Sequence, residues 1–236
     1  MRKKAIVIGT GIAGLASILR LLQKGYQVKA FETNDYVGGK ITSFQSKGYR
    51  WDMGPSLFTM PQYVNELFEL FGENPKDHFN YNKKEVLCNY FWEDGTTFSA
   101  KSDPSLFVKE VSQVFKIDPV IITDYLKKSK LKYDLTAPIF LEKSLHRWAT
   151  YFSFSTIKAL FNLAHLNLFD SLDQLNKRKL KHKKLIQFFN RFATYNGSSP
   201  YKTPGIMSMI PHLEMGLGTY FPHGGMHEIS QSLYRL

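Results

Sequence analysis

Residues 4–40 constrain the fold of this chain more than any other stretch. A short apolar run at residues 5–8 ends at a glycine turn, a segment with helical apolar spacing follows at residues 12–24, and a second short apolar run lies at residues 28–31. The turn has the sequence Gly9-Thr10-Gly11-Ile12-Ala13-Gly14. This order predicts a buried parallel strand, a tight turn, a helix that Gly25 ends, and a second strand. The chain is therefore expected to open with a Rossmann-like unit of an α/β fold, a parallel sheet with helices.

The glycines of this turn suit a bound dinucleotide. Gly9 permits the tight turn, Gly11 leaves no Cβ between the backbone and a diphosphate, and Gly14 lets the helix pack closely on the strand. The amides at the helix N-terminus, at Ile12 and Ala13, would then lie against the phosphates. A lone GxGxxG motif is weak because such turns also occur in purely structural loops, so the prediction depends on the residues around it.

An acidic residue follows at the distance that a nucleotide-binding unit requires. Glu32 ends the second strand, where its carboxylate can accept hydrogen bonds from both ribose hydroxyls of an adenosine and would repel a 2′-phosphate. Val37, Gly38, Gly39 and Lys40 come shortly after it. This extension resembles the flavoprotein version of the motif, in which the second glycine pair approaches the dinucleotide and the cation faces its phosphates. The resemblance implies FAD rather than NAD as the cofactor.

Composition limits the class of protein. With 236 residues, 43% of them hydrophobic, the chain is long enough for one large domain or two ordinary ones. The one cysteine, Cys88, excludes an internal disulfide framework and is expected to be a buried, inert thiol. Neither an apolar run of about 18 residues nor a signal peptide is present. We therefore expect a cytoplasmic protein, which the net charge of +11 biases toward anionic surfaces such as the cytoplasmic face of a membrane.

Two catalytic classes find no support in the sequence. The seven histidines are far apart or unsuitably spaced, and none forms HExxH or faces a cysteine pair, so no metal site is expected. No GxSxG motif occurs, so a serine hydrolase of the α/β type is not expected either.

Beyond the glycine-rich region, short strands alternate with helices. Two strands are predicted at residues 41–44 and 49–52, followed by an amphipathic helix at 61–71. Residues 79–100 are strand-like, with a hairpin turn at 94–95. This change of texture predicts the beginning of a second, substrate-side domain.

The next part of the chain is mostly helical in pattern. Prolines at the first turn predict helices at residues 105–115 and from 119 toward 133. Residues 148–169 are the most apolar and aromatic segment, but interspersed polar residues prevent a simple membrane-spanning helix. Two interpretations stay open: a pair of buried helices, or a segment that lines a hydrophobic substrate tunnel or dips into a membrane interface.

A basic run follows at residues 177–184, where seven of eight residues are Lys, Arg or His. It is interpreted either as a solvated helix face or loop or as a contact for anionic lipid head groups. Interleaved aromatic residues and zinc spacing are missing, so no nucleic-acid partner is expected.

Two stretches resemble one family. GYRWDMGPSLFTMP at residues 48–61 is similar to the stretch after the FAD motif in bacterial-type phytoene desaturases, and residues 191–226, with NGSSPYKTP and FPHGGM, are similar to the middle of those enzymes. In related flavoproteins the first stretch passes the flavin side of the cofactor. The resemblance therefore implies that Gly54, Pro55 and Ser56 belong to the FAD site.

The resemblance covers almost the whole chain and implies its domain organisation. Residues 1–75 would form the FAD-binding segment, residues 76–220 an α+β substrate domain of mixed sheet and helices, and residues 221–236 the start of the return to the FAD domain. Members of the family are longer and end in a second FAD-binding segment that has no counterpart here. The chain is therefore expected to lack the C-terminal part of the family fold and to be inactive by itself.

The chemistry that the resemblance implies is FAD-dependent desaturation of a polyene, such as phytoene or a hydroxylated carotenoid, in carotenoid biosynthesis. A hydrophobic polyene, a peripheral contact with the membrane surface, and a quinone or oxygen as electron acceptor would be the partners. The residues leave other possibilities open: an amine oxidase-like oxidoreductase, a carotenoid isomerase, or an inactive flavoprotein remnant. No catalytic base can be assigned, since Asp134, Glu142 and Glu214 are all expected to be exposed.

Overall fold

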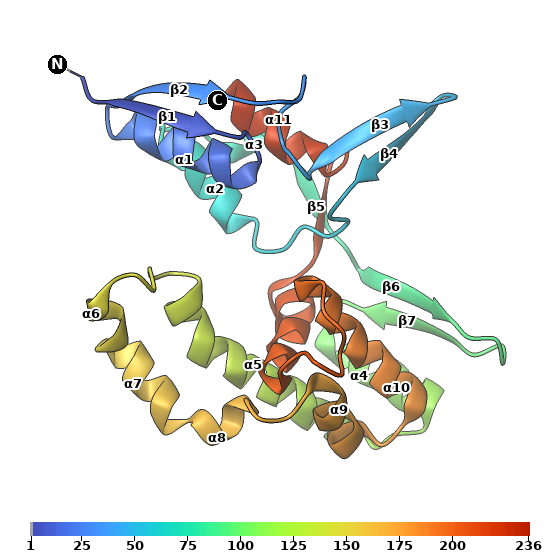
Figure 1. The fold of residues 1–236 in the computed structure, drawn as a ribbon. Helices are drawn as coiled ribbons and strands as arrows, with labels where there is room; N and C mark the ends of the chain where they lie inside the picture. The colour runs from blue at the N-terminus through green and yellow to red at the C-terminus, as the bar shows by residue number, and fades with distance from the viewer. Residues whose placement is uncertain (1) are drawn as a thin grey trace. The chain divides into compact units, whose positions relative to one another are not determined.

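The computed structural model describes residues 2–236, and the chain divides into two compact units (Figure 1). The first unit comprises residues 2–84 and 218–236, and the second comprises residues 85–217. Both units contain strands and helices, so the fold is mixed α/β. The roles assigned from the sequence to residues 1–75, 76–220 and 221–236 stay predictions.

The first unit is built from short strands and helices. They are β1 (Lys4–Ile8), α1 (Ile12–Gln23), β2 (Gln27–Phe31), β3 (Thr42–Ser46), β4 (Tyr49–Met53), α2 (Gln62–Glu69), α3 (Pro75–His78), β5 (Tyr81–Lys83), β8 (Tyr220–Pro222) and α11 (His227–Arg235). β1 pairs with β2 in parallel, whereas β3 pairs with β4 and β5 pairs with β8 in antiparallel fashion. The predicted strand, helix and strand at the start of the chain are confirmed, and so are the two strands around the turn at residues 47–48.

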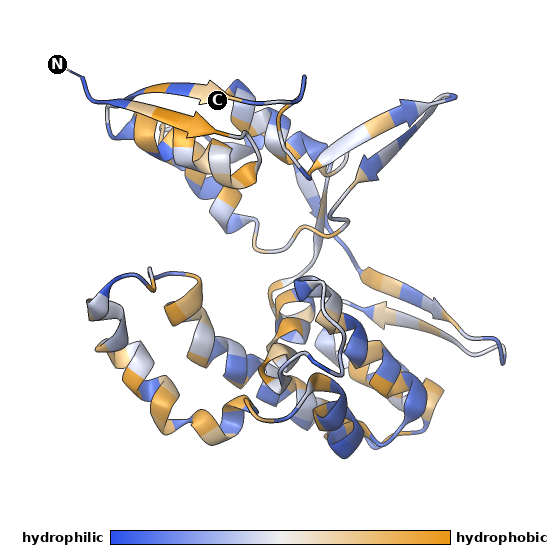
Figure 2. Cartoon of the chain, viewed as in Figure 1, coloured by the Kyte–Doolittle hydropathy of each residue, from blue (hydrophilic) through white to orange (hydrophobic). Residues whose placement is uncertain are grey.

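The parallel sheet is smaller and more exposed than the sequence predicts. Within residues 2–236, β1 and β2 pair only with each other, and α1 packs against them. Ile6 is 68% exposed and Ile8 is 86% exposed, and Figure 2 shows β1 as a hydrophobic strand. The prediction of a buried strand is therefore wrong for this structure. The reason is that apolar spacing reports which side chains can be buried, while burial itself needs an element that covers them.

The core of the first unit joins its two sequence segments. Leu15 and Leu19 of α1, Leu67 and Phe68 of α2, and Ile229 of α11 belong to one buried hydrophobic cluster. Phe68 is completely buried, as the helical apolar spacing at residues 61–71 predicts. α11 follows Met226, and its apolar face completes this core.

The second unit is mainly helical. It contains β6 (Val86–Phe91), β7 (Thr97–Lys101), α4 (Pro104–Phe115), α5 (Pro119–Phe140), α6 (Trp148–Tyr151), α7 (Phe154–Phe161), α8 (Leu163–Leu166), α9 (Leu172–Leu180), α10 (Lys183–Asn190), the 3₁₀ helices η1 (Arg191–Asn196) and η2 (Gly205–Met209), and the π-helical turn η3 (His212–Leu217). β6 and β7 form the predicted hairpin, with Gly95 at φ 81° in its turn.

The helix starts of this unit follow from local chemistry, and its core is aromatic. The carboxylate of Asp103 accepts hydrogen bonds from the Ser105 and Leu106 amides at the start of α4, and each of α4 and α5 has a proline in its first turn. The core of the second unit is aromatic: its completely buried phenyl rings are those of Phe98, Phe107, Phe188, Phe189 and Phe192. Cys88 is only half-buried, contrary to the prediction of a buried thiol, because it lies on the hairpin rather than in this cluster.

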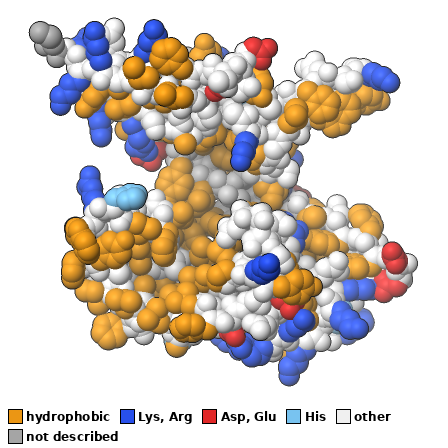
Figure 3. All heavy atoms as spheres, in the orientation of Figure 1, with side chains coloured by type: hydrophobic (Ala, Val, Ile, Leu, Met, Phe, Trp, Pro, Cys, Tyr) orange, Lys and Arg blue, Asp and Glu red, His pale blue; other side chains and the backbone are white. Residues whose placement is uncertain are grey.

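The apolar segment at residues 148–169 is helical but not buried. α6, α7 and α8 account for most of it, yet the side chains of Trp148, Phe154 and Phe161 are largely exposed. In Figure 3 hydrophobic side chains gather over the part of the unit where Figure 1 places α6, α7 and α8. The interpretation of this segment as a pair of buried helices is therefore wrong.

The basic run lies where α9 ends and α10 begins. Lys181 adopts a left-handed conformation (φ 54°) between the two helices, and His182 caps α10. Three cations of the run form ion pairs with acidic side chains of the same unit: Lys177 with Asp173, Arg178 with Asp170, and Lys184 with Asp94.

Candidate functional site

The glycine turn joins β1 to α1, and its backbone segments pack closely against each other. The Gly9 amide donates to the carbonyl oxygen of Phe31 at 2.7 Å, which fixes the turn to the end of β2. A Cβ on Gly14 would lie 2.0 Å from the Gly9 carbonyl oxygen, so only glycine fits there. α1 begins after Gly11 with no side chain that caps its first amides. These amides remain available for an anionic ligand at the positive end of the helix dipole.

The second glycine pair lies beside the first turn. The Gly38 amide donates to the Thr10 carbonyl oxygen at 2.8 Å, and Gly11 and Gly38 form a parallel bridge. Gly38 has φ 109°, and a Cβ there would lie 2.4 Å from the Ile41 carbonyl oxygen. A Cβ on Gly39 would lie 3.3 Å from the Cα of Gly11. The structure thus brings together the two glycine motifs that the sequence separates.

Glu32 lies against the first of these motifs. Its Oε2 atom accepts hydrogen bonds from the amide and the hydroxyl of Thr10, both at 2.8 Å, and its Oε1 atom accepts from the amides of Thr33 and Asn34. These bonds, that of the Thr10 amide first, lower the pKa of Glu32 from 4.5 to about 2. The carboxylate is therefore ionised at neutral pH and fixed at the edge of the turn.

A histidine that the sequence did not single out for this site holds the second glycine pair in place. The Nε2 atom of His227, on α11, lies 2.9 Å from the Val37 carbonyl oxygen. A carbonyl oxygen can only accept, so Nε2 carries the hydrogen, and Nδ1 can then accept from the Ser43 hydroxyl at 3.5 Å. His227 is buried, and its ring meets that of Tyr36 edge-on. Its place two residues after the Gly224-Gly225 pair was the available signal.

The remaining predicted residues lie on the segment around β3 and β4. Gly54 is next to Lys40, since a Cβ on Gly54 would lie 2.0 Å from the Lys40 carbonyl oxygen. Pro55 and Ser56 follow in an exposed stretch. The structure brings Gly54 and Lys40 together and leaves Pro55 and Ser56 on the surface of the first unit.

Asp52 connects this segment to α11. Its Oδ1 atom accepts from the Met226 amide at 3.0 Å and from Arg50 at 2.8 Å. Burial by itself would raise the pKa of Asp52, but the hydrogen bond and the charge of Arg50, together with the backbone amides of Met226 and His227, outweigh it and the pKa is lowered. A Cβ on Gly225 would lie 2.1 Å from the Arg50 guanidinium, so the glycine lets Arg50 reach Asp52.

A cavity of about 430 Å³ opens beside Glu32 within the first unit. The loop at residues 34–37 and the α11 side chains of His227 and Gln231 also line it. Its walls carry carboxylate, amide and aromatic groups, which are the groups that bind a nucleoside.

These features fit a flavin dinucleotide. The uncapped start of α1 supplies amide donors, the Gly11 and Gly38 backbones leave no side chain in the way, and Glu32 presents a carboxylate at the end of β2. The chemistry of this donor set matches a diphosphate next to a ribose.

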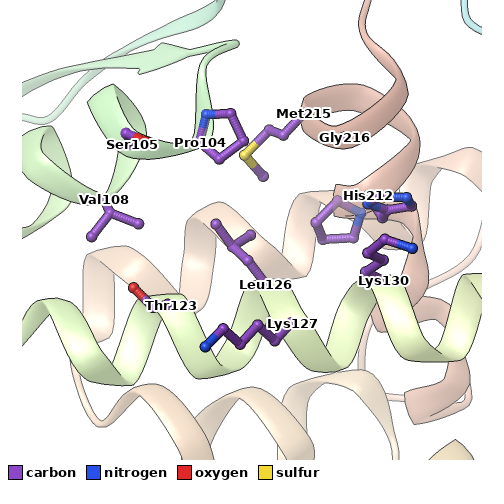
Figure 4. Close-up of a pocket in the computed structure, with 11 residues that line it drawn as sticks. Pro104, Ser105, Val108, Thr123, Leu126, Lys127, Lys130, His212, Met215 and Gly216 are labelled. Atoms are coloured by element: carbon purple, nitrogen blue, oxygen red, sulfur yellow. The ribbon is translucent and has the colours of Figure 1, made fainter.

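A second cavity, of about 520 Å³, lies within the second unit (Figure 4). α4, α5 and η3 supply its walls, and most of the lining is apolar, including Val108, Leu126 and Met215. Lys127 and Lys130 add positive charge to it. An apolar hollow with a few polar groups is the usual form of a site for a hydrophobic small molecule.

His212 is the polar group at one end of this cavity. Its ring packs against Gly216, since a Cβ there would lie 2.1 Å from Nδ1, and the ring of Tyr133 lies 5.2 Å away. Burial, with Lys130 as a further cause, lowers the pKa of His212. The imidazole is therefore neutral at physiological pH and can exchange hydrogen bonds with a hydroxyl group.

Of the three acidic residues considered as a base, Glu214 is placed differently from the prediction. It is only 1% exposed, and its carboxylate accepts from Arg191 at 2.7 Å and from the Tyr195 hydroxyl at 2.6 Å. The expectation of an exposed Glu214 is wrong because Arg191 compensates its buried charge. Asp134 forms an exposed ion pair with Lys130, and Glu142 is exposed, as predicted.

Comparison with known proteins assigns the class. The family of flavin containing amine oxidoreductases matches residues 12–236, and the chain belongs to this family. FAD is its cofactor.

Particular relatives carry the assignment further. The chain is 56% identical over 234 residues to the 1-hydroxycarotenoid 3,4-desaturase of a Flavobacterium species. The alignment covers 99% of this chain and 48% of the relative. It is 30% identical to the 4,4′-diapolycopene oxygenase of a Methylomonas species, over 99% of this chain and 47% of that protein. The resemblance to carotenoid desaturases is therefore confirmed, and the chain spans about half the length of the relatives it matches.

Solved structures support the fold. Cyclohexylamine oxidase from Brevibacterium oxydans is similar with a TM-score of 0.61 and 16% identity, over 99% of this chain and 49% of that one. The likeness shows a shared mixed α/β fold across about half of the amine oxidase chain.

Proposed function

We propose that the whole protein catalyses the FAD-dependent dehydrogenation of a hydroxylated carotenoid, introducing a double bond into the polyene. The observation that carries this proposal is the bridge between Gly11 and Gly38 beside Glu32, an arrangement that fits a dinucleotide, in a chain that is 56% identical to a 1-hydroxycarotenoid 3,4-desaturase. The apolar cavity of the second unit supports the choice of substrate.

In the first unit, the amides of Ile12 and Ala13 would hold the diphosphate, with Gly9, Gly11 and Gly14 leaving room for it. Glu32 would bind the ribose, whose hydroxyls can take the places of the exposed Thr33 and Asn34 side chains. Lys40 would face the phosphates, and Gly38, Gly39, Gly54, Pro55 and Ser56 would lie along the cofactor. When bound, FAD would supply the redox chemistry: a hydride would pass to it from an allylic carbon, the neighbouring carbon would release a proton to the medium, and the two electrons would be returned to a quinone or oxygen.

In the second unit, the cavity beside α4 and α5 would hold the end of the polyene that carries the hydroxyl group. The neutral imidazole of His212 can hydrogen-bond to that hydroxyl, while Val108, Leu126 and Met215 contact the hydrocarbon. The chain's own contribution is thus to position the substrate and to exclude water from it.

The cavity argues against an amine as the substrate. A protonated amine would be repelled by Lys127, and no carboxylate lines this cavity among the described residues. An apolar polyene has no charge to repel.

An apolar polyene resides in membranes, so we also propose that the protein makes a peripheral contact with the membrane that contains its substrate.

Pigment analysis tests the proposed reaction. The whole protein is produced in bacteria that make an acyclic 1-hydroxycarotenoid. The pigments are then separated, and their molecular masses are determined by mass spectrometry. The expected product has lost two hydrogens and absorbs at longer wavelength because its conjugation is longer. A product that has gained oxygen would instead assign an oxygenase, and an unchanged substrate in the presence of flavin-loaded protein would refute the proposal.

A further inference from the structure

Five large aromatic side chains around α6, α7 and α8 point into solvent. We call them the aromatic face: Trp148 (80% exposed), Phe152 (78%), Phe154 (81%), Phe161 (88%) and Phe169 (fully exposed). Leucine and isoleucine side chains between them add to the same surface, and hydrophobic atoms dominate this region in Figure 3. An exposed apolar surface of this density in a folded protein marks a contact with a partner or a membrane.

The aromatic face follows from helix geometry rather than from disorder of the chain. On α7, Phe154, Ile157 and Phe161 lie at helical spacings of three and four residues and therefore project from one side. Ala159, on the other side, is buried, and α7 packs on α5. The helix thus has a small inner residue that anchors it and a large apolar stripe that it presents outward.

Basic residues outnumber acidic ones along the segment that carries the aromatic face, and Asp170, next to Phe169, is paired with Arg178. Between residues 141 and 169, Lys143, Arg147 and Lys158 are opposed by Glu142 alone. Lys158 is next to Ile157 on α7, so its alkyl stem can lie along the apolar surface while the ammonium reaches a head group. This pattern complements an anionic lipid surface.

Aromatic residues with a polar edge occupy one end of this surface. The rings of Trp148 and Tyr151 lie 6.0 Å apart on α6. Indole and phenol groups prefer the head-group layer, where one side of the ring is apolar and the other is wet. A second protein chain would not require this arrangement, whereas a membrane interface favours it.

The basic run at residues 177–184 is the weaker candidate for the same role. Lys177, Arg178 and Lys184 are engaged in ion pairs, which reduces the net charge that the run offers to lipid.

Within residues 2–236 no helix has the length and apolar character to cross a bilayer. A membrane contact by this part of the chain therefore has to be interfacial.

We propose that the aromatic face inserts into the interfacial layer of a bilayer that contains anionic lipid, so that α7 lies in the plane of the membrane. This inference rests on the membrane contact proposed above and names the surface that makes it. Neither flavin nor substrate turnover enters its test, so its failure can be told apart from a failure of the proposed reaction.

Vesicle flotation of the 236-residue chain tests the inference. Vesicles of phosphatidylcholine mixed with phosphatidylglycerol are compared with vesicles of phosphatidylcholine alone. We expect the wild-type chain to float with both and more strongly with the anionic vesicles. The combined variant Phe154→Ser, Phe161→Ser and Phe169→Ser should lower the partition coefficient at least about tenfold, because three aromatic rings no longer leave water.

A control removes three other exposed hydrophobic side chains of the same unit, Phe91 (78% exposed), Leu106 (54%) and Tyr201 (68%). Phe91→Ser, Leu106→Ser and Tyr201→Ser together should leave partitioning at the wild-type value. Circular dichroism and thermal melting check that both triple variants fold. The inference is overturned if the wild type floats with neither vesicle, or if the aromatic-face variant floats as well as the control. It is also overturned if the wild type stays in solution as a dimer that the aromatic-face variant converts to a monomer, since the partner would then be a second copy.

Discussion

The imidazole of His227 donates a hydrogen bond from Nε2 to the carbonyl oxygen of Val37 at 2.9 Å. This bond joins α11 to the segment just before Gly38, which in turn donates to Thr10 in the first glycine turn. Both glycine motifs therefore depend on a helix that lies 190 residues further along the chain. The candidate FAD site is complete only when the two sequence segments of the first unit have come together.

Replacement of His227 tests this dependence. His227→Ala removes the hydrogen bond to Val37 and leaves a cavity, so we expect a loss of about 1–3 kcal/mol in the free energy of unfolding and weaker FAD binding. His223→Ala, at an exposed position nearby, is the control and should change neither quantity. Chemical denaturation and flavin titration measure the two effects. Equal FAD affinity in His227→Ala and wild type would show that α11 does not support the site.

The carboxylate of Glu32 should make stability depend on pH. Its pKa is about 2 in the folded chain against 4.5 ordinarily, so the unfolded state binds a proton first as the pH falls. The stabilisation is therefore fully present above pH 4.5 and is lost as the pH falls toward 2. In thermal scans, the melting temperature of Glu32→Gln should change less with pH across this window than that of the wild type. An identical pH profile in the variant would show that the hydrogen bonds from Thr10 do not stabilise the folded chain.

The buried pair of Arg191 and Glu214 should be far more important for stability than an exposed pair. Arg191→Met leaves the Glu214 carboxylate buried beside Tyr195 without its cation, and we expect a loss of about 3–5 kcal/mol in the free energy of unfolding. Arg178→Met breaks an ion pair with Asp170 that is open to solvent, and about 0–1 kcal/mol is expected. Urea denaturation of both variants gives the comparison. Similar losses would mean that burial does not set the strength of the Arg191 pair.

His212 should determine whether a hydroxylated substrate is preferred. In the whole protein, His212→Leu keeps the cavity apolar but removes the hydrogen-bonding group, so kcat/KM should fall about 10-fold or more for a hydroxylated carotenoid and much less for its deoxy analogue. His212→Gln, which can still hydrogen-bond, should retain part of the preference. A parallel fall for both substrates would instead indicate a structural role for the ring against Gly216.

Local signals in the sequence were sufficient to predict the elements of the candidate cofactor site. The turn from Gly9 to Gly14, the helix after it and the strand before Glu32 are specified by neighbouring residues, and the structure contains all of them. The hairpin at Gly95 follows from an equally local pattern.

Burial and long-range pairing could not be predicted in the same way. Ile8 was expected inside, and for Phe161 a buried helix was one of two interpretations, but nothing in a single sequence says whether another element covers these apolar side chains. Glu214 is charged and was expected outside, because its partner Arg191 lies 23 residues earlier and only the fold brings the two together. The bond between His227 and Val37 depends on tertiary structure for the same reason.

Flavin titration of the whole protein tests the central claim most directly. The apoprotein is reconstituted with FAD, and the bound flavin is counted by its absorbance after release. We expect the wild type to saturate with a single FAD per chain. Gly11→Val should bind none, whereas Gly11→Ala should keep the melting temperature of the apoprotein, because a Cβ at Gly11 meets nothing closer than the Gly38 carbonyl oxygen at 4.0 Å. Gly14→Ala should instead lower that melting temperature, since its Cβ would lie 2.0 Å from the Gly9 carbonyl oxygen. Wild-type protein without releasable flavin, or a Gly11→Val variant that binds FAD as tightly as the wild type, would contradict the account.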